Sequence, residues 1–138
     1  DFDNSPAVRK LAGRIAAERG LHIYSVFKIP YAERCFSLCG PENFLGLVQG
    51  ADFVLSNSFH ATAFSVIFER EFAVVERTEK INTRMRDFTA LLGLSDHMVT
   101  ETVNVPLHTD WTQVTRRLED EIDHAKAYID EVLRDVER

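Results

Sequence analysis

The sequence contains little cysteine and tryptophan, and it contains no long apolar run. Cys35 and Cys39 are the two cysteines among 138 residues, and a single tryptophan is present. Two cysteines are too few for a disulfide scaffold or a structural zinc site, so we expect free thiols in a reducing cytoplasm. Without about 18 consecutive apolar residues, the sequence predicts no transmembrane helix.

Basic side chains are fewer than acidic ones. Lysine and arginine number 16 against 22 acidic residues, which gives a formal net charge of -6. This balance disfavours a nucleic-acid partner, because nucleic acids attract basic surfaces. The first residues, 1–4, show no basic or apolar character typical of a signal peptide. With 45% hydrophobic and 28% charged residues, the chain has the composition of one globular domain over residues 1–138.

Helical and strand-like segments alternate along the chain. Apolar runs predict strands at 21–27, 52–55 and 72–75, and capping signals predict helices beginning near Pro6, Pro41, Ser58, Thr83 and Asp110. Strands joined by crossover helices form a parallel sheet covered on both faces, so the fold class is α/β. Such a sheet usually begins with a strand, whereas this chain begins with a helix and without Met. We therefore expect that it continues a longer protein.

The expected last helix carries a long apolar stripe. Its opposite face alternates acidic and basic side chains, as a solvated surface does, and Trp111 at its beginning is expected to anchor it by packing. We expect the stripe to face inward; its residues are Val114, Leu118, Ile122, Ala125, Ile129, Val132, Leu133 and Val136.

Ligands of open parallel sheets bind beyond the carboxyl ends of the strands, which here are followed by residues 28–40, 56–60 and 76–83. The middle segment passes directly from a strand into a helix, whose free N–H groups favour an anion. Asn57, Ser58 and Thr62 supply neutral hydrogen bonds there, and His60 adds an imidazole, the type of side chain whose charge can change near neutral pH. The alternative is that the first two merely cap the helix and that His60 is a half-buried helix residue. No histidine has a spacing typical of a metal site, so we expect neither a metal nor a cofactor.

The stretch Ala51-Asp52-Phe53-Val54-Leu55-Ser56-Asn57-Ser58-Phe59-His60-Ala61-Thr62-Ala63-Phe64-Ser65 resembles the polysaccharide pyruvyl transferase family. That family typically shows an apolar strand, then Ser-Phe-His-Gly-Thr or Ser-x-Arg-x-His, and then a helix. Residues 41–48 resemble it as well, and so do Asn82-Thr83-Arg84-Met85 and Leu91-Leu92-Gly93-Leu94. Ser58 stands where many members have arginine. Ala61 stands where close relatives have glycine, and its methyl group would crowd the ligand.

The resemblance implies transfer of a pyruvyl group from phosphoenolpyruvate to sugar hydroxyls as a ketal, in bacterial exopolysaccharide biosynthesis. The sugar acceptor would be a lipid- or nucleotide-linked precursor of a cell-surface glycan, handled in the cytoplasm or at the inner face of the membrane. The fold implied is a Rossmann-like three-layer domain, the carboxyl-terminal half of a two-domain protein similar to GT-B glycosyltransferases. The missing N-terminal half would complete the cleft, so we expect this part alone to be inactive.

The resemblance also assigns residues. His60 matches the motif histidine and is the expected catalytic residue, with Asn57, Ser58, Thr62 and Arg84 as the substrate-binding residues. Arg84 could replace the arginine that the motif lacks here, since a guanidinium suits a phosphate or carboxylate. The neighbouring Arg77, Lys80 and Arg86 are expected to be surface charges.

Two other functions remain open at this stage. One is a nucleotide-sugar-binding half of a GT-B glycosyltransferase. The other is a non-catalytic binding or assembly module that uses its long last helix as an interface.

Overall fold

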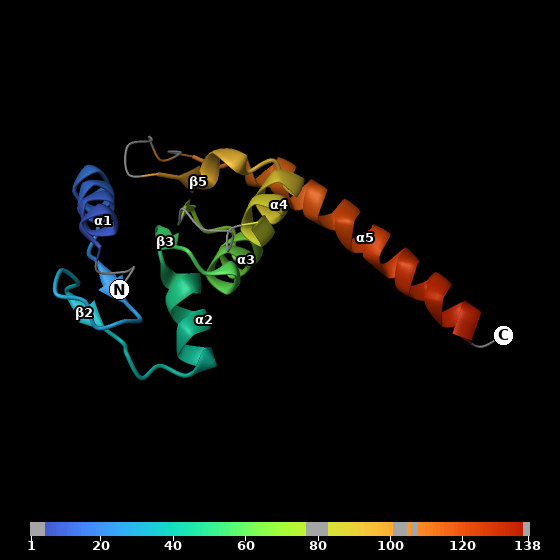
Figure 1. The fold of residues 1–138 in the computed structure, drawn as a ribbon, viewed down its shortest axis with the longest axis horizontal. Helices are drawn as coiled ribbons and strands as arrows, with labels where there is room; N and C mark the ends of the chain where they lie inside the picture. Colours follow the sequence, from blue (N-terminus) through green and yellow to red (C-terminus); the bar gives the residue numbers. More distant parts are fainter. Residues whose placement is uncertain (1–4, 77–82, 101–104, 106–107, 137–138) are drawn as a thin grey trace.

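The computed structural model describes residues 5–76, 83–100, 105 and 108–136. In this part of the chain, short parallel strands lie among helices, and the last helix extends well beyond the rest (Figure 1). The strands are β1 (Tyr24–Ser25), β2 (Arg34–Cys35), β3 (Val54–Ser56), β4 (Phe72–Val75) and β5 (Met98–Val99). The helices are α1 (Pro6–Arg19), α2 (Pro41–Gly50), α3 (Phe59–Ile67), α4 (Thr83–Leu91) and α5 (Trp111–Val136), and a 3-10 turn, η2 (Ser95–His97), precedes β5.

All strand pairs among the described residues are parallel. β1 pairs with β2, and β3, β4 and β5 form a separate sheet in that order. In this larger sheet Val54 lies opposite Phe72, and Val74 lies opposite Met98. Parallel strands joined through helices confirm the predicted α/β, Rossmann-like class.

The described residues do not form the single continuous sheet that we expected, because the strands divide into two separate sheets. The strand expected over 21–27 is reduced to Tyr24–Ser25, and within the described part of the chain it pairs with β2 alone. The sequence did not reveal β2, because both of its residues are exposed and give no apolar pattern. It did not reveal β5 either, since two residues after a 3-10 turn are too few for a periodicity.

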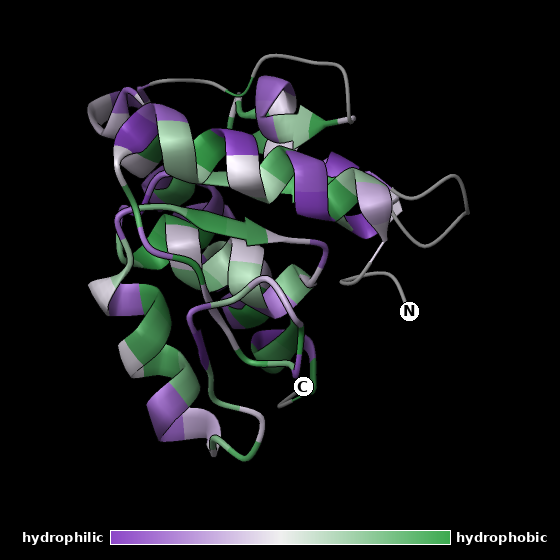
Figure 2. Ribbon diagram, turned by 90° about the vertical axis from the view of Figure 1, so that its left-hand side faces the viewer, coloured by the Kyte–Doolittle hydropathy of each residue, from purple (hydrophilic) through white to green (hydrophobic). Residues whose placement is uncertain are grey.

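The core lies on both faces of β4, whose four residues are all buried. Phe72 and Val74 pack in a cluster with residues of α3, α4 and the first turns of α5, whereas Ala73 and Val75 pack against α1. Side chains of a strand alternate between its faces, so one apolar strand holds the two helical layers together. In Figure 2 this central sheet is drawn in green between helices of mixed colour.

Capping residues set the ends of the helices. The backbone N–H of Val8 donates to Ser5 Oγ at 3.3 Å at the beginning of α1, and Gly20 ends that helix with φ of +65°. The N–H of Gln113 donates to Asp110 Oδ1 at 3.4 Å at the beginning of α5. These are the capping positions that the sequence predicts, since such side chains satisfy the free amides of a first turn.

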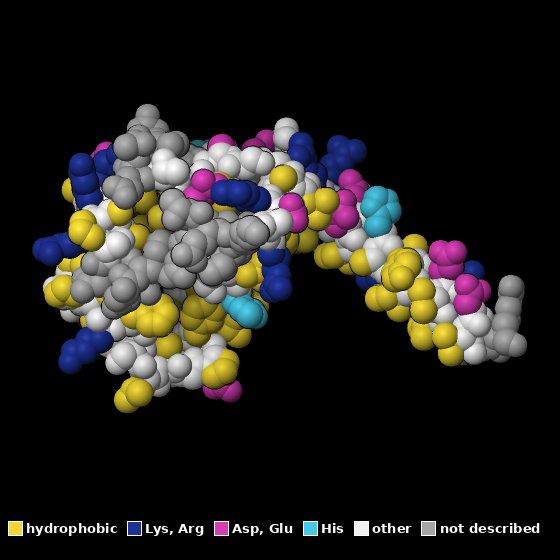
Figure 3. All heavy atoms as spheres, in the orientation of Figure 1, with side chains coloured by type: hydrophobic (Ala, Val, Ile, Leu, Met, Phe, Trp, Pro, Cys, Tyr) yellow, Lys and Arg dark blue, Asp and Glu magenta, His cyan; other side chains and the backbone are white. Residues whose placement is uncertain are grey.

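The prediction that the apolar stripe of α5 faces inward is wrong beyond Leu118. Val114 is buried, and Trp111 and Leu118 pack partly against the core as expected. Further along, the helix leaves the body of the domain, and Figure 3 shows yellow side chains along one side of it. A sequence stripe identifies an apolar face but not whether a surface covers it. The exposed apolar residues there are Ile122, Tyr128, Ile129, Val132, Leu133 and Val136, and Leu91 of α4, also expected inward, is exposed too.

Within the described ranges, no helix combines the length and the apolar character that a membrane crossing requires.

Candidate functional site

The candidate site lies where β3 passes into α3. Because β3, β4 and β5 are parallel, their carboxyl ends share one edge of the sheet. Asn57 and Ser58 follow β3 at this edge, Glu76 follows β4, and α4 begins nearby in sequence at Thr83. The predicted surface cations Arg77 and Lys80 lie outside the described residues.

Ser58 is the N-cap of α3, but its side chain does not cap the helix. The backbone N–H of Ser58 instead donates to Ser56 Oγ at 3.0 Å, which fixes the turn between strand and helix. Ser58 is exposed and Asn57 is half-buried. The first amides of α3 therefore donate no hydrogen bond to the side chain of their own cap, and the Ser58 hydroxyl lies at the surface beside them.

Phe59 brings His60 and Arg84 to one place. Its ring centre lies 6.3 Å from that of His60 in an edge-on arrangement, and the guanidinium carbon of Arg84 lies 5.6 Å from it. Behind it, the Phe88 ring of α4 packs edge-on with centroids 5.4 Å apart. His60 and Arg84 are both exposed. An imidazole and a guanidinium thus flank one aromatic ring at the mouth of the β3–α3 turn.

Thr62 lies inside the protein and not at its surface. It is 1% exposed, and its hydroxyl donates to the Ser58 carbonyl oxygen at 3.0 Å. Such a hydroxyl holds the first turn of α3 from inside, and Met85 of α4 lies against it. Ala61 is also buried, at 4% exposure, so its methyl group packs within the protein.

One nearby cation already has a partner. Arg86 Nε lies 3.1 Å from Glu76 Oε1, so this pair joins α4 to the end of β4. An exposed pair of this kind contributes little to stability, in agreement with the surface role expected for Arg86. Arg84, two residues earlier on the same helix, contacts the Phe59 ring instead.

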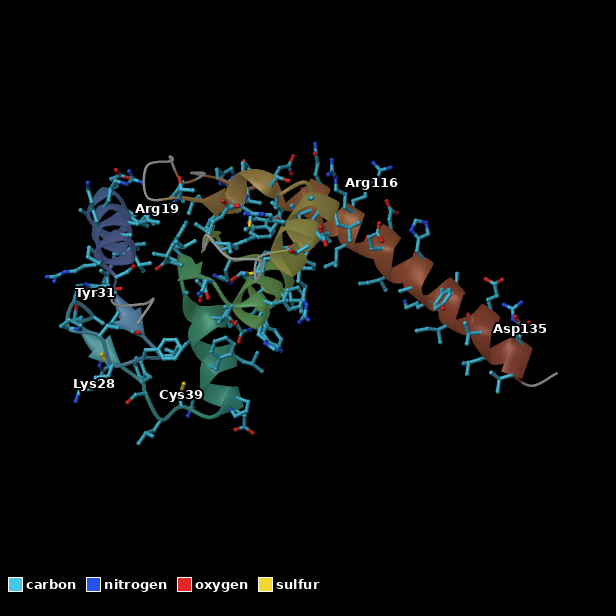
Figure 4. The ribbon with its side chains drawn as sticks, in the orientation of Figure 1. Arg19, Lys28, Tyr31, Cys39, Arg116 and Asp135 are labelled. Atoms are coloured by element: carbon cyan, nitrogen blue, oxygen red, sulfur yellow. The ribbon has the colours of Figure 1, made fainter. Side chains whose placement is uncertain are left out.

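The two cysteines lie apart from this place. Both are free thiols, and Figure 4 marks Cys39 in the segment before α2. Cys35 Sγ lies 3.6 Å from the Ile29 carbonyl oxygen. In the part of the chain that the structure describes, no three His, Cys, Asp or Glu side chains gather as a metal site would require.

Sequence reasoning missed a buried polar cluster elsewhere. His97, at 2% exposure, contacts Asp96 and Thr109, and Thr109 contacts Glu71. These residues come from η2, from the segment before α5 and from the turn before β4. No sequence spacing joins positions 71, 97 and 109, so only the fold reveals the cluster.

Comparison with known families gives one match. The model of a family described as polysaccharide pyruvyl transferase matches residues 2–79, more than half of the chain. The match covers β3, α3 and β4, and therefore the whole β3–α3 turn with His60. No curated protein and no solved structure matches the chain.

Proposed function

The chain belongs to the polysaccharide pyruvyl transferase family, and we propose that it binds phosphoenolpyruvate and contributes to pyruvyl transfer onto a sugar. The observation that carries this proposal is the juxtaposition of His60, which lies within the matched residues 2–79, and Arg84, which lies beyond them, around the Phe59 ring. A cation and a titratable group beside free helix amides suit a small dianionic donor.

The reaction defines what such a site must do. The terminal CH₂ carbon of phosphoenolpyruvate gains a proton, and a sugar hydroxyl adds to the neighbouring carbon and loses its own proton. The bond from that carbon to the phosphate oxygen then breaks, and a second hydroxyl adds there and loses its proton. The products are a carboxyethylidene ketal and inorganic phosphate. Of the two protons removed from the hydroxyl groups, the balance delivers one to carbon and one to the leaving phosphate.

Each residue of the site has a role in this proposal. His60 moves a proton, since an imidazole both donates and accepts near neutral pH. Arg84 pairs with the carboxylate or phosphate of the donor, which a planar guanidinium suits. Ser58 and Asn57 donate hydrogen bonds at the beginning of α3. Thr62 acts indirectly, because its buried hydroxyl holds the Ser58 carbonyl in place.

The proposal extends to the acceptor and the setting. The acceptor is a lipid- or nucleotide-linked sugar of a glycan precursor, handled in the cytoplasm or at the inner face of the membrane. Catalysis needs donor and acceptor held together. We therefore expect a further, amino-terminal half to complete the cleft and these 138 residues alone to show no turnover.

Ligand-dependent stability tests the donor. A ligand that binds only the folded state raises its melting temperature. Phosphoenolpyruvate should therefore raise the melting temperature of the protein, and a uridine nucleotide should not. The opposite result would identify a nucleotide-sugar site and contradict the proposal.

Kinetics of the complete enzyme test the roles proposed for Arg84 and His60. Arg84→Ala should mainly raise the Michaelis constant for phosphoenolpyruvate, because the contact exists in both ground and transition states. His60→Ala should mainly lower turnover, by about 10²- to 10⁴-fold for a lost proton transfer. Arg116→Ala is the control, since Arg116 lies exposed near the beginning of α5 (Figure 4). Unchanged kinetics for His60→Ala would contradict the assignment of His60 as the residue that moves a proton.

A further inference from the structure

A hollow of about 690 Å³ lies between residues 35–39 and the first turns of α2. This volume falls within the range of roughly 300–1,000 Å³ that is typical of small-molecule sites. Figure 4 marks Cys39 in one of its two walls, and the other wall is one face of α2. The roles proposed above for His60 and Arg84 make no use of this hollow.

Backbone hydrogen bonds hold the first wall in shape. The N–H of Phe36 donates to the Ser25 carbonyl oxygen at 2.7 Å, which continues the pairing of β1 with β2. The N–H of Cys39 donates to the Phe36 carbonyl oxygen at 3.1 Å and closes the turn between them. The ring of Phe36 also packs against Tyr24, with centroids 5.9 Å apart. This side of the hollow is therefore preformed.

The second wall is one face of α2. Glu42 and Gly46 lie one helical turn apart, as do Asn43 and Leu47, so all four share that face. Leu47 is half-buried, like Phe36 across the hollow, whereas Glu42 and Asn43 are exposed. The hollow thus combines apolar surface with a carboxylate and an amide, which is the composition of a site for a small polar molecule.

Gly46 is unexplained by the fold of the chain itself. It lies inside α2, where glycine is less favourable than alanine, and its backbone is not left-handed. A Cβ added to it would have no atom within 4 Å, so packing does not require glycine either. A glycine that faces open space in a hollow lets a ligand approach the helix closely.

The charge of the hollow favours a neutral ligand rich in hydroxyl groups. None of the described residues that line it is lysine or arginine, and Glu42 is acidic, so the anionic phosphoenolpyruvate does not suit it. A carboxylate accepts hydrogen bonds from hydroxyl groups, and the amide of Asn43 both donates and accepts. An aromatic ring such as Phe36 offers a flat apolar surface to the C–H groups of a pyranose. These are the contacts that a sugar makes.

The hollow and the β3–α3 turn lie at the same edge of the fold. α2 ends at Gly50, shortly before β3 begins at Val54, so the beginning of α2 is directed toward the carboxyl end of β3. α3 begins at that end as well. Phe44 of α2 packs edge-on against Phe64 of α3, with centroids 6.4 Å apart, and the two helices lie side by side (Figure 1).

We propose that this hollow binds a sugar unit of the acceptor. Glu42 and Asn43 contact its hydroxyl groups, Phe36 contacts its C–H face, and the missing side chain of Gly46 leaves room for the ring. The inference rests on the proposed transfer to a sugar and gives the second substrate a place beside the donor.

Nuclear magnetic resonance of the 138 residues tests the place of the sugar. The probes are the methyl glycosides of galactose, glucose, mannose and N-acetylglucosamine, each titrated into the protein separately. At least one should shift the amide signals of Ser37, Asn43 and Gly46 in a saturable way. No saturable shift from any of the four, or shifts confined to other segments, would overturn the proposal.

A separate titration with phosphoenolpyruvate distinguishes this inference from the proposed donor site. Phosphoenolpyruvate should shift the amide signals of Ser58 and His60 and leave those of the hollow unchanged. If a glycoside binds in the hollow but phosphoenolpyruvate shifts neither Ser58 nor His60, the sugar site stands and the donor assignment fails. Shifts of the hollow by phosphoenolpyruvate and by none of the glycosides would overturn the sugar site.

Gly46→Ala tests the close approach of the sugar to α2. Its methyl group fills space in the hollow and should raise the dissociation constant of the glycoside at least about fivefold. Its melting temperature should not fall, because alanine favours the helix. Gly13→Ala is the matched control, since Gly13 is also an exposed helical glycine with nothing within 4 Å of an added Cβ. It should leave the dissociation constant unchanged.

Glu42→Gln provides a second variant, which decides the matter if Gly46→Ala does not fold. It keeps the size of the side chain but loses one acceptor and the charge, so the dissociation constant should rise by about two- to tenfold. Wild-type affinity in Gly46→Ala, or in Glu42→Gln where the first variant does not fold, would overturn the proposal.

Discussion

The guanidinium carbon of Arg84 lies 5.6 Å from the centre of the Phe59 ring. This contact joins the first turn of α4 to the first turn of α3 across the carboxyl edge of the sheet. His60 lies against the same ring, and Phe88 supports it from behind. A half-buried aromatic side chain thereby sets the relative positions of two exposed groups that are 24 positions apart in the sequence.

Replacing Phe59 should weaken donor binding without touching a charged group. Phe59→Leu removes the ring beneath Arg84, and an exposed cation–π contact contributes about 0.5–1 kcal/mol. The Michaelis constant of the complete enzyme for phosphoenolpyruvate should therefore rise by roughly two- to fivefold. Phe59→Tyr keeps the ring and should leave it unchanged.

Combining the substitutions shows whether Phe59 acts through Arg84. If it does, Phe59→Leu should have a smaller effect in an Arg84→Ala background than in the wild type. Thermal melts of all four proteins, without ligand, separate this effect from a general loss of stability. Fully additive effects on the Michaelis constant would show that the ring does not position the guanidinium.

The two ends of α5 should respond differently to truncation of a side chain. Val114→Ala removes two methyl groups from the core and should lower the free energy of unfolding by about 1.5–3 kcal/mol. Ile129→Ala should change it by less than about 0.5 kcal/mol, because Ile129 is 55% exposed. Urea denaturation curves measure both. An equally large loss for Ile129→Ala would mean that another surface covers the far half of α5 in solution.

The sequence predicts elements best where a signal is local. Ser5, Gly20 and Asp110 mark helix ends because capping needs only neighbouring residues, and β4 is an unbroken apolar run of four. Pairing between strands is not local. Nothing in Arg34 or Cys35 indicates that they form a ladder with β1, and the division into two sheets follows from such pairings.

The candidate site likewise has parts that the sequence predicts and parts that it does not. The turn from β3 into α3 follows from the sequence around it, but the sequence leaves open whether His60 is an exposed site residue or a half-buried helix residue. The inward position of Thr62 does not, since a threonine near a helix beginning can either face solvent or bond the preceding turn. The polar cluster at His97 depends on three segments meeting, and no pattern in any one of them predicts it.

Gly93 and Gly13 should respond to alanine with opposite signs. Gly93 ends α4 with φ of +74°, a left-handed conformation that costs an L-residue about 1–2 kcal/mol. A Cβ there would also overlap Nη1 of Arg117, so that side chain would have to move. Gly13 lies exposed within α1, with nothing within 4 Å of an added Cβ. Alanine there should stabilise the helix by about 0.5–1 kcal/mol.

Urea denaturation of the two alanine variants should therefore place them on opposite sides of the wild type. An Arg117→Ala background separates the two causes at Gly93, because it removes the crowded guanidinium and leaves the backbone strain. Gly93→Ala should remain destabilising in that background by at least about 1 kcal/mol. If its cost instead vanishes with Arg117, contact with the guanidinium rather than the left-handed backbone is what demands glycine at the end of α4.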